Sequence, residues 1–374
     1  MSILGDELIF NRKLQHIKIV LTEDVDFPNN CRELYNGIKL VHQALPLVNY
    51  DDIDTRIEFL GYQLSAPIII TGMTGGHKGV TKINYDLARL AEEYRIAIGV
   101  GSQRPLTIDP SNDVVESYRI VRRTAPDVPV VGNIGANTLN DLDTEKVLEL
   151  ISILDADALA VHLNPAQEAI QPEGDTRFSE TIVDRLVDIL DKSPVPIIIK
   201  EVGNGLSMET VKILAGLGVR YFDVAGACGT NWILVEKYRS ENRTKKMIAD
   251  LLRQWGIPTP ISVIETRYTA PDSFIIASGG VWDALSAVKN LVLGADMIGF
   301  AKPILKKLIE EKTEGAKQFL NTMIEGIRTV MFLVGAKNIN ELYHKPVILP
   351  CSLINYMEQR GIDPKIYNEM RLKR

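Results

Sequence analysis

Eight short apolar runs alternate with longer amphipathic stretches from residue 67 onward, and this alternation restricts the fold more than any other feature. The runs are rich in Val and Ile and do not alternate with polar residues, as expected of parallel strands covered on both faces. They span residues 67–71, 97–100, 128–132, 158–162, 196–200, 221–224, 274–277 and 297–300. Helical patterns lie between them at 84–94, 113–123, 145–154, 180–190 and 208–217. Eight β-α units in series predict an α/β fold, a TIM (β/α)8 barrel, with a doubly wound sheet as the alternative.

Three segments lie outside a minimal barrel. Residues 1–66 precede the first strand and predict an N-terminal extension to a barrel of residues 67–340. After the sixth strand, about residues 229–270 are too long for a simple connection. Their aromatic and apolar content, including Trp232 and Trp255, favours an ordered lid or helical insertion. Residues 341–374 predict a C-terminal helical tail.

Composition excludes several classes of protein. The chain has 374 residues, of which 45% are hydrophobic, enough for a substantial core. A net charge of -6 argues against a nucleic-acid partner, and no apolar run reaches the roughly 18 residues of a membrane span. The mixed N-terminus resembles neither a signal nor a transit peptide. Three scattered cysteines predict neither a disulfide framework nor a metal cluster, so we expect a reducing, cytoplasmic compartment.

The end of the fourth strand carries the most informative polar group. His162, Asn164, Gln167 and Glu168 follow an apolar run within a few residues, and such groups are costly to bury without partners. An ordinary helix start, with Asn164 as cap and Pro165 in the first turn, is the alternative interpretation. One carboxylate together with ligand phosphates and water suits Mg²⁺, which makes Glu168 a candidate metal ligand. Zinc is not indicated, because no His/Cys set has suitable spacing.

The last two strands end in small-residue turns that each lead into a helical pattern, at residues 278–280 and 299–303. Loops after strands seven and eight of a barrel typically aim backbone N–H groups at a phosphate. Lys200 ends the fifth strand, Asn133 ends the third, and a glycine-rich turn at 72–76 follows the first. This arrangement is expected for flavin mononucleotide (FMN). No G-x-G-x-x-G follows a strand, so a Rossmann domain is not supported.

Two further strand ends carry reactive side chains. Ser102 and Arg104 follow the second strand and suit an anionic ligand, because Arg pairs bidentately with phosphate. Cys228 follows the sixth strand, and a nucleophilic role stays open, although nothing in the sequence indicates that its thiolate is favoured.

Taken together, these residues resemble type 2 isopentenyl diphosphate isomerases, an FMN-dependent family of barrel enzymes. The matching segments, in chain order, are Arg12-Lys13 with His16, Met73-Thr74-Gly75-Gly76, Gly101-Ser102-Gln103-Arg104, Gly132-Asn133-Ile134-Gly135, His162-Leu163-Asn164-Pro165-Ala166-Gln167-Glu168, Lys200-Glu201, Gly229-Thr230-Asn231-Trp232 and Ser278-Gly279-Gly280. The segment 162–168 is the most specific. This chain departs from the family at Ala225, where Ser is common, and at Cys228, where Gly is common.

The resemblance implies a set of site residues. Expected FMN contacts are Gly72, Met73, Thr74, Ser102, Asn133, Lys200, Thr230, Gly279, Gly280, Ala301 and Lys302. Expected substrate contacts, including those of the N-terminal extension, are Arg12, Lys13, His16, Ser102, Gln103, Arg104, His162, Asn164 and Gln167. Gln167, His162 and Lys200 are the implied catalytic residues, and Glu168 is the implied ligand of Mg²⁺.

The resemblance also implies an activity in isoprenoid biosynthesis, the interconversion of isopentenyl and dimethylallyl diphosphate by an allylic 1,3-proton shift. Unactivated alkenes are very weak bases, so an ordinary side-chain acid is poorly matched to protonating them. Reduced FMN would exchange the protons, Gln167 would orient or relay at C2, and Lys200 would stabilise the anionic reduced flavin. NADPH or another reductant would keep the flavin reduced, and a homotetramer or larger homo-oligomer is expected.

Two other functions remain open from the sequence. An FMN-dependent barrel oxidoreductase acting on a hydroxy acid or nucleotide would need a base at a late strand end, where strand seven offers only Ser278 and glycines. A non-catalytic flavin- or phosphate-binding barrel would need neither Gln167 nor Glu168.

Overall fold

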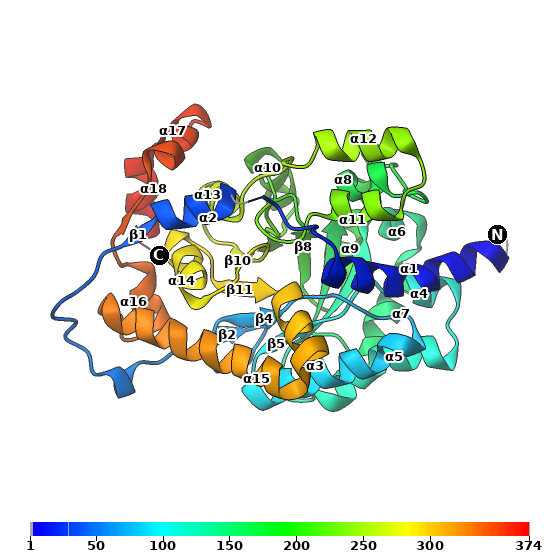
Figure 1. The fold of residues 1–374 in the computed structure, drawn as a ribbon, viewed down its shortest axis with the longest axis horizontal. Helices are drawn as coiled ribbons and strands as arrows, with labels where there is room; N and C mark the ends of the chain where they lie inside the picture. Colours follow the sequence, from blue (N-terminus) through cyan, green and yellow to red (C-terminus); the bar gives the residue numbers. More distant parts are fainter. Residues whose placement is uncertain (1–2, 29, 374) are drawn as a thin grey trace.

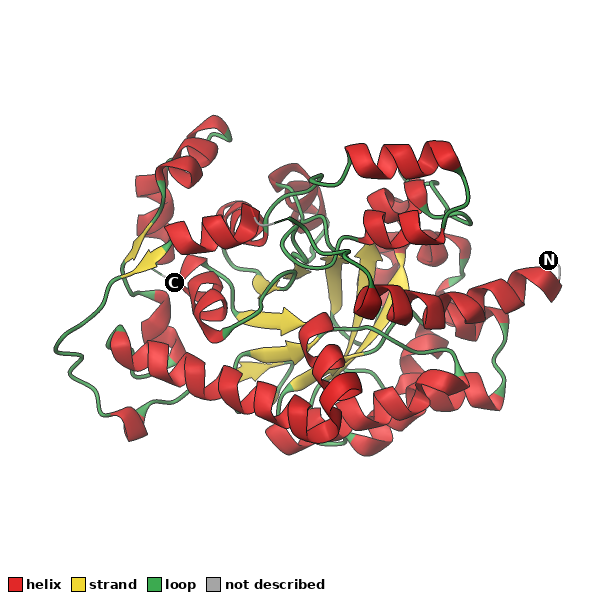
Figure 2. Ribbon diagram, in the orientation of Figure 1, coloured by secondary structure: helices red, strands yellow, loops and turns green. Residues whose placement is uncertain are grey.

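A closed barrel of eight parallel strands forms the centre of the computed structural model, which describes residues 3–28 and 30–373, with side chains from residues 12–28 and 31–373 (Figures 1 and 2). The strands are β4 (Ile68–Ile70), β5 (Ala97–Gly99), β6 (Val130–Gly135), β7 (Ala158–Leu163), β8 (Ile197–Glu201), β9 (Tyr221–Asp223), β10 (Phe274–Ala277) and β11 (Met297–Phe300). The barrel closes where β11 pairs with β4, with Ile298 opposite Ile68. The predicted TIM barrel is therefore confirmed, and the doubly wound sheet is wrong.

Aliphatic residues fill the barrel from the inside and cover it on the outside. Inward-facing side chains such as Ile69, Val131 and Ile198 pack together along the axis, and their neighbours on each strand pack against the surrounding helices. A small hairpin, β2 (Ile57–Phe59) and β3 (Tyr62–Leu64), adds Phe59 and Leu64 to the axial cluster. Phe59 stacks on Phe274 at the start of β10, so the hairpin closes the amino end of the barrel. The carboxyl end of the barrel is not covered by this hairpin and is therefore where a binding site can form.

Helices surround the barrel in the order that the sequence predicts. The ring contains α3 (Thr81–Tyr94), α5 (Asn112–Thr124), α7 (Thr144–Leu154), α9 (Thr181–Lys192), α10 (Met208–Gly216), α13 (Thr259–Thr269), α14 (Ala284–Leu293) and α15 (Lys302–Leu333). After it come α16 (Ile339–Tyr343), β12 (Val347–Ile348), α17 (Cys351–Gln359) and α18 (Pro364–Arg371). Strand β12 pairs antiparallel with β1 (Lys39–Leu40) and so joins the C-terminal tail to the N-terminal extension. No helix within the described ranges is long and apolar enough to cross a bilayer.

The N-terminal extension packs against the insertion over the carboxyl end of the barrel. Helices α1 (Ile3–Thr22) and α2 (Asn30–Gly37) come from the extension, and α11 (Trp232–Arg239) and α12 (Arg243–Leu251) from the insertion (Figure 1). Asp26 and Thr230 form an antiparallel bridge, and Val20 packs against Leu234. The short helices α4 (Arg104–Ile108), α6 (Ala136–Asp141) and α8 (Pro165–Ile170) begin within a few residues of the ends of β5, β6 and β7. Two chain segments far apart in sequence thus share one surface above the barrel.

A disulfide joins this extension to the barrel. Cys31 of α2 is bonded to Cys228 in the loop after β9, 197 residues further along the chain. The sequence predicted no disulfide framework, and it did not reveal this single pairing, because only the fold shows that α2 lies over this loop. Cys228 has no free thiolate in this state, so the nucleophilic interpretation loses its basis. The cysteine count likewise no longer supports a reducing compartment.

Candidate active site

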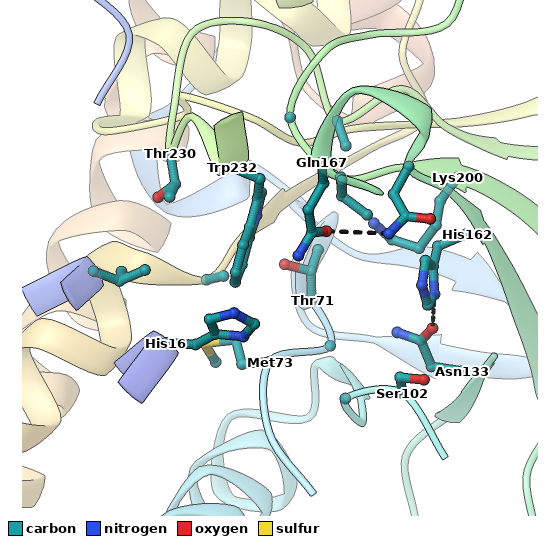
Figure 3. Close-up of a pocket in the computed structure, with 18 of the residues that line it drawn as sticks. His16, Thr71, Met73, Ser102, Asn133, His162, Gln167, Lys200, Thr230 and Trp232 are labelled. Atoms are coloured by element: carbon teal, nitrogen blue, oxygen red, sulfur yellow. Dashed lines mark hydrogen bonds between the residues drawn. The ribbon is translucent and has the colours of Figure 1, made fainter. Parts of the chain in front are cut away.

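One pocket at the carboxyl end of the barrel brings together nearly all of the predicted site residues (Figure 3). It is lined by Arg12, Lys13, His16, Gly72, Met73, Thr74, Ser102, Arg104, Asn133, His162, Asn164, Gln167, Glu168, Lys200, Thr230, Gly279, Gly280, Ala301 and Lys302. Gln103 is the exception. Its buried amide donates to the carbonyl of Leu150 and accepts from the N–H of Asn133, so it supports the β6 end from outside the pocket. We therefore remove Gln103 from the candidate substrate contacts.

His162 and Asn133 form a fixed pair on neighbouring strands. The His162 Nδ1 atom lies 2.8 Å from Asn133 Oδ1, which only accepts, so Nδ1 carries the proton (Figure 3). Asn133 in turn donates to the carbonyl of Val100. Burial, together with the nearby charge of Lys200, lowers the pKa of His162 to about 3. His162 is therefore a neutral hydrogen-bonding group at physiological pH.

Lys200 lies beside Asp223, a buried carboxylate that the sequence did not indicate as a site residue. Its Nζ atom donates to the carbonyl of Glu201 at 2.6 Å and lies 3.4 Å from Asp223 Oδ2. Ser278, after β10, donates to the other oxygen of Asp223. Asp223 falls within a predicted apolar strand, and a carboxylate inside such a run was the signal that could have identified it.

Gln167 belongs to a buried network that reaches into the insertion. Its Nε2 atom donates to Glu236 Oε1 at 2.9 Å, and its carbonyl oxygen accepts from Asn164 at 3.2 Å. His16 Nε2 lies 2.9 Å from the same Glu236 oxygen, and Arg239 pairs with the second oxygen at 2.5 Å. Burial would raise the pKa of Glu236, but the contacts with His16 and Arg239 and the Gln167 hydrogen bond outweigh it and lower this pKa to about 2. Glu236 is therefore a buried anion that fixes the orientation of Gln167.

Trp232 and His16 close the pocket on the side of the extension. Their rings pack edge to face with centroids 5.0 Å apart, and both line the pocket. Neither lies on a barrel strand, since His16 belongs to α1 and Trp232 begins α11. An apolar group bound in the pocket would therefore meet an aromatic wall supplied by the two additions to the barrel.

Three cationic side chains gather in the same pocket. Arg12 lies 3.5 Å from Glu173, whereas Lys13 and Arg104 form no ion pair with any carboxylate in the described part of the chain. Burial lowers the pKa of Lys13 to about 7, and the charge of Arg12 contributes. A cluster of incompletely compensated cations with forked Arg donors suits a di- or polyphosphate.

Glu168, the metal ligand that the sequence predicts, lines the pocket together with Asp175. Its oxygens accept from Asn164 at 2.9 Å, from Gln171 at 3.2 Å and from the N–H of Asp175 at 2.7 Å. No group of three or more His, Cys, Asp or Glu residues in the described ranges is arranged to hold a metal ion. A cation at Glu168 would therefore need most of its ligands from a bound phosphate and water.

Glycine turns form the opposite end of the pocket. Gly279 and Gly280 have φ angles of 88° and 76°, which residues other than glycine adopt only with strain. A Cβ atom on Gly279 would lie 2.3 Å from the carbonyl oxygen of Gly226. The backbone N–H groups of Gly280 and Ala301 have no hydrogen-bond partner within the described chain, and helix α15 begins at the next residue, Lys302. Free N–H groups at the start of a long helix suit a phosphate.

Lys302 differs from the other predicted contacts at this end. Both oxygens of Asp26 lie 2.8 Å from its Nζ atom, so its charge is already neutralised by the extension. The phosphate end of the pocket therefore relies on backbone N–H groups, and Lys302 also ties the extension to the barrel.

Comparison with known proteins assigns this chain to a protein family. Residues 123–348 match the family of FMN-dependent dehydrogenases. Mandelate oxidase has the same fold, with a TM-score of 0.62 over 93% of this chain and 99% of that one at 13% identity. The fold and the site thus define a barrel of the FMN-dependent dehydrogenase class.

Relatives with higher sequence identity show which family within this class the chain belongs to. The chain is 41% identical to an isopentenyl-diphosphate delta-isomerase of Metallosphaera sedula over 97% of its own length and 99% of the relative's. It is 43% identical to the enzyme of the same name from Sulfurisphaera tokodaii, over 98% of each chain. The chain belongs to the isopentenyl-diphosphate delta-isomerase family.

Proposed function

We propose that this protein interconverts isopentenyl diphosphate and dimethylallyl diphosphate, using FMN in its reduced form together with Mg²⁺. One observation carries the proposal: a single pocket is lined by a glycine turn that suits a phosphate, by the three cations Arg12, Lys13 and Arg104, and by Gln167. Family membership supports the same reaction, because its relatives carry that activity in their names. The reductant, the oligomeric state and the cellular location stay predictions.

The residues present fit FMN. The N–H groups of Gly280 and Ala301 would hold its phosphate, and the positive φ angles of the 279–280 turn leave room for it. Gly72 lines the pocket and would lie beside the flavin ring. Only glycine fits at this strand end, because a Cβ atom there would meet the carbonyl oxygen of Val100 at 2.1 Å. Lys200 offers a positive charge at the same rim. Reduced FMN would supply an electron-rich ring and exchangeable protons for an alkene that side-chain acids protonate poorly.

The cationic cluster would bind the substrate diphosphate. Arg12, Lys13 and Arg104 converge there, and His162 would add a neutral hydrogen bond. Diphosphate binding would favour protonation of Lys13, whose pKa in the free pocket is about 7. Glu168 would hold Mg²⁺ against the diphosphate, since its carboxylate is the acidic group beside Asn164 in the pocket.

Gln167 would act at the carbon that gives up a proton. Its amide is held between Asn164 and the Glu236 carboxylate, so its orientation is fixed before substrate binds. Trp232 and His16 would cover the isoprenoid carbons and exclude water from them. Fixing these groups in advance avoids reorganisation during the reaction.

The decisive experiment incubates the pure protein with FMN, Mg²⁺, dithionite and isopentenyl diphosphate in deuterated water. We expect dimethylallyl diphosphate that carries deuterium. The variant Gln167→Ala should bind FMN normally and lose most of the turnover. A protein that binds FMN but leaves isopentenyl diphosphate unlabelled and unconverted would refute the proposal.

An FMN-dependent oxidoreductase is the second candidate, favoured by the match to the FMN-dependent dehydrogenases. Such an enzyme would need a base to abstract a substrate proton. The strand-seven end offers Ser278, which donates to Asp223, and burial lowers the pKa of His162 to about 3, which makes it a weak base. The isomerase therefore accounts for more of the site.

A further inference from the structure

Asp223 is a buried carboxylate at the rim of the site that the proposed proton chemistry leaves unused. It lies on β9, directly opposite Lys200 of β8 in the strand register. Partners in register on parallel strands point to the same face of the sheet, so both side chains point into the barrel. Both also line a small cavity directly beneath the main pocket, together with Asn133 and Thr71.

The two oxygens of Asp223 have different partners. Oδ1 accepts from the hydroxyl of Ser278 at 2.5 Å and from the N–H of Ala225 at 3.3 Å. Oδ2 faces Lys200 Nζ at 3.4 Å. Asp223 and Ser278 are 3% and 5% exposed, so water screens this contact only weakly. Ser278 therefore fixes the carboxylate with one oxygen directed at the ammonium group.

We propose that Asp223 is a positioning residue that competes with the bound flavin for the Lys200 ammonium group and thereby sets the reduction potential of the flavin. The inference rests on the proposed function, because it requires FMN beside Lys200. Two electrons and one proton convert oxidised FMN to its anionic reduced form. Lys200 favours that anion, and Asp223 weakens this effect by neutralising the ammonium group and holding it toward the barrel axis.

Asp223→Asn tests the inference in the FMN-loaded protein. The amide oxygen keeps the contacts with Ser278 and Ala225, whereas the charge that holds Lys200 is lost. We expect the ratio of affinities for reduced over oxidised FMN to rise about tenfold, a positive shift of about 30 mV for a two-electron couple. The potential is measured against a reference dye while xanthine and xanthine oxidase deliver the electrons.

Two further variants separate positioning from a purely structural role. Ser278→Ala removes the donor to Oδ1, so the Asp223 carboxylate, still anchored by Ala225, directs its full negative charge at Lys200, and the potential should fall. In a Lys200→Met background, Asp223→Asn should change the affinity ratio less than threefold. Asp157→Asn is the matched control, because Asp157 is also ion-paired, to Arg122, but lies at the opposite end of the barrel, where β7 begins. Its potential should equal that of the unaltered protein.

Each outcome decides the inference. A potential that stays constant or falls in Asp223→Asn overturns it, and so does an equal shift in the Lys200→Met background. If Asp223→Asn does not fold or does not load FMN, Ser278→Ala decides, and an unchanged potential there overturns the inference. Failure of the unaltered protein to bind FMN would refute the proposed function instead, so the two failures are distinguishable.

Discussion

Glu236→Gln removes one charge from the most deeply buried acid of the site and leaves the shape of its side chain intact. Glu236 is fully buried, accepts from Gln167 and pairs with Arg239 at 2.5 Å. A carboxamide has one acceptor oxygen, so it cannot serve Gln167 and Arg239 together. Either the amide of Gln167 loses its acceptor or the Arg239 guanidinium does.

The size of the stability loss follows from the pKa of Glu236. This pKa falls from 4.5 to about 2 in the folded protein, which corresponds to about 3 kcal/mol in favour of the ionised carboxylate. Removing one member of a buried ion pair costs about 3–5 kcal/mol, a consistent value. Because the folded-state pKa is lowered, the contribution is fully present above pH 4.5 and is lost as the pH falls toward 2. The difference in unfolding free energy between the two proteins should therefore be about 3 kcal/mol at pH 7 and shrink below pH 4.5.

Both turnover and stability should fall in Glu236→Gln, whereas the affinity for FMN should stay unchanged. Misorienting a group that acts in proton transfer costs about 10²-fold or more in kcat. Glu236 does not line the pocket itself, so the Kd for FMN, measured by fluorescence titration, should stay unchanged. Glu265→Gln is the matched control, since Glu265 is equally buried and accepts from Tyr356 and Arg360 far from the pocket. It should lose stability in urea and keep its kcat. A Glu236→Gln protein with unaltered kcat would refute the positioning of Gln167 by Glu236.

Three further predictions follow from the pocket. Gly279→Ala places a Cβ atom 2.3 Å from the Gly226 carbonyl and should weaken FMN binding at least tenfold by titration; unchanged affinity would contradict the phosphate cradle. Burial lowers the pKa of His162 to about 3, so the contribution of this neutral histidine to stability falls from pH 6.5 downward, by about 2 kcal/mol between pH 7.5 and 5. Urea unfolding at both values should show the unaltered protein losing about 2 kcal/mol relative to His162→Asn, a comparison that cancels the other titrating groups, such as buried Glu201 with its pKa raised to about 7. Burial lowers the pKa of Lys13 to about 7, so pyrophosphate binding at pH 8 should take up a proton, measured by calorimetry in two buffers, and Lys13→Met should abolish the uptake.

The barrel was predictable because its determinants are local. A strand that is buried on both faces must be aliphatic throughout, and all eight such runs form strands. The polar residues at their ends also converge as predicted, since parallel strands of a closed barrel end at one rim. Sequence order alone therefore brought His162, Asn133 and Lys200 to the same pocket.

Long-range packing accounts for what the sequence did not reveal. Glu236 contacts Gln167 across 69 residues and Cys31 contacts Cys228 across 197, and neither pairing leaves a periodic signal. Gln103 was wrongly expected at the site for a related reason. It lies in a polar motif, yet its side chain points away from the pocket and supports the backbone of β6. A motif identifies a neighbourhood, but which way a side chain faces depends on the elements packed against it.

The pocket divides into two halves of different origin, and this division explains how one barrel class can host a reaction outside oxidation. The proposed flavin end is built by strand ends and turns of the barrel, Gly72, Asn133, Lys200 and the 279–280 turn. The opposite wall is built largely by the additions: Arg12 and His16 come from α1, and Trp232 comes from α11. Gln167 sits at the boundary, on a barrel loop but oriented by a residue of the insertion. On the proposed function, the cofactor site is formed by the barrel and the substrate site largely by the added helices, so a substitution in one half leaves the other intact.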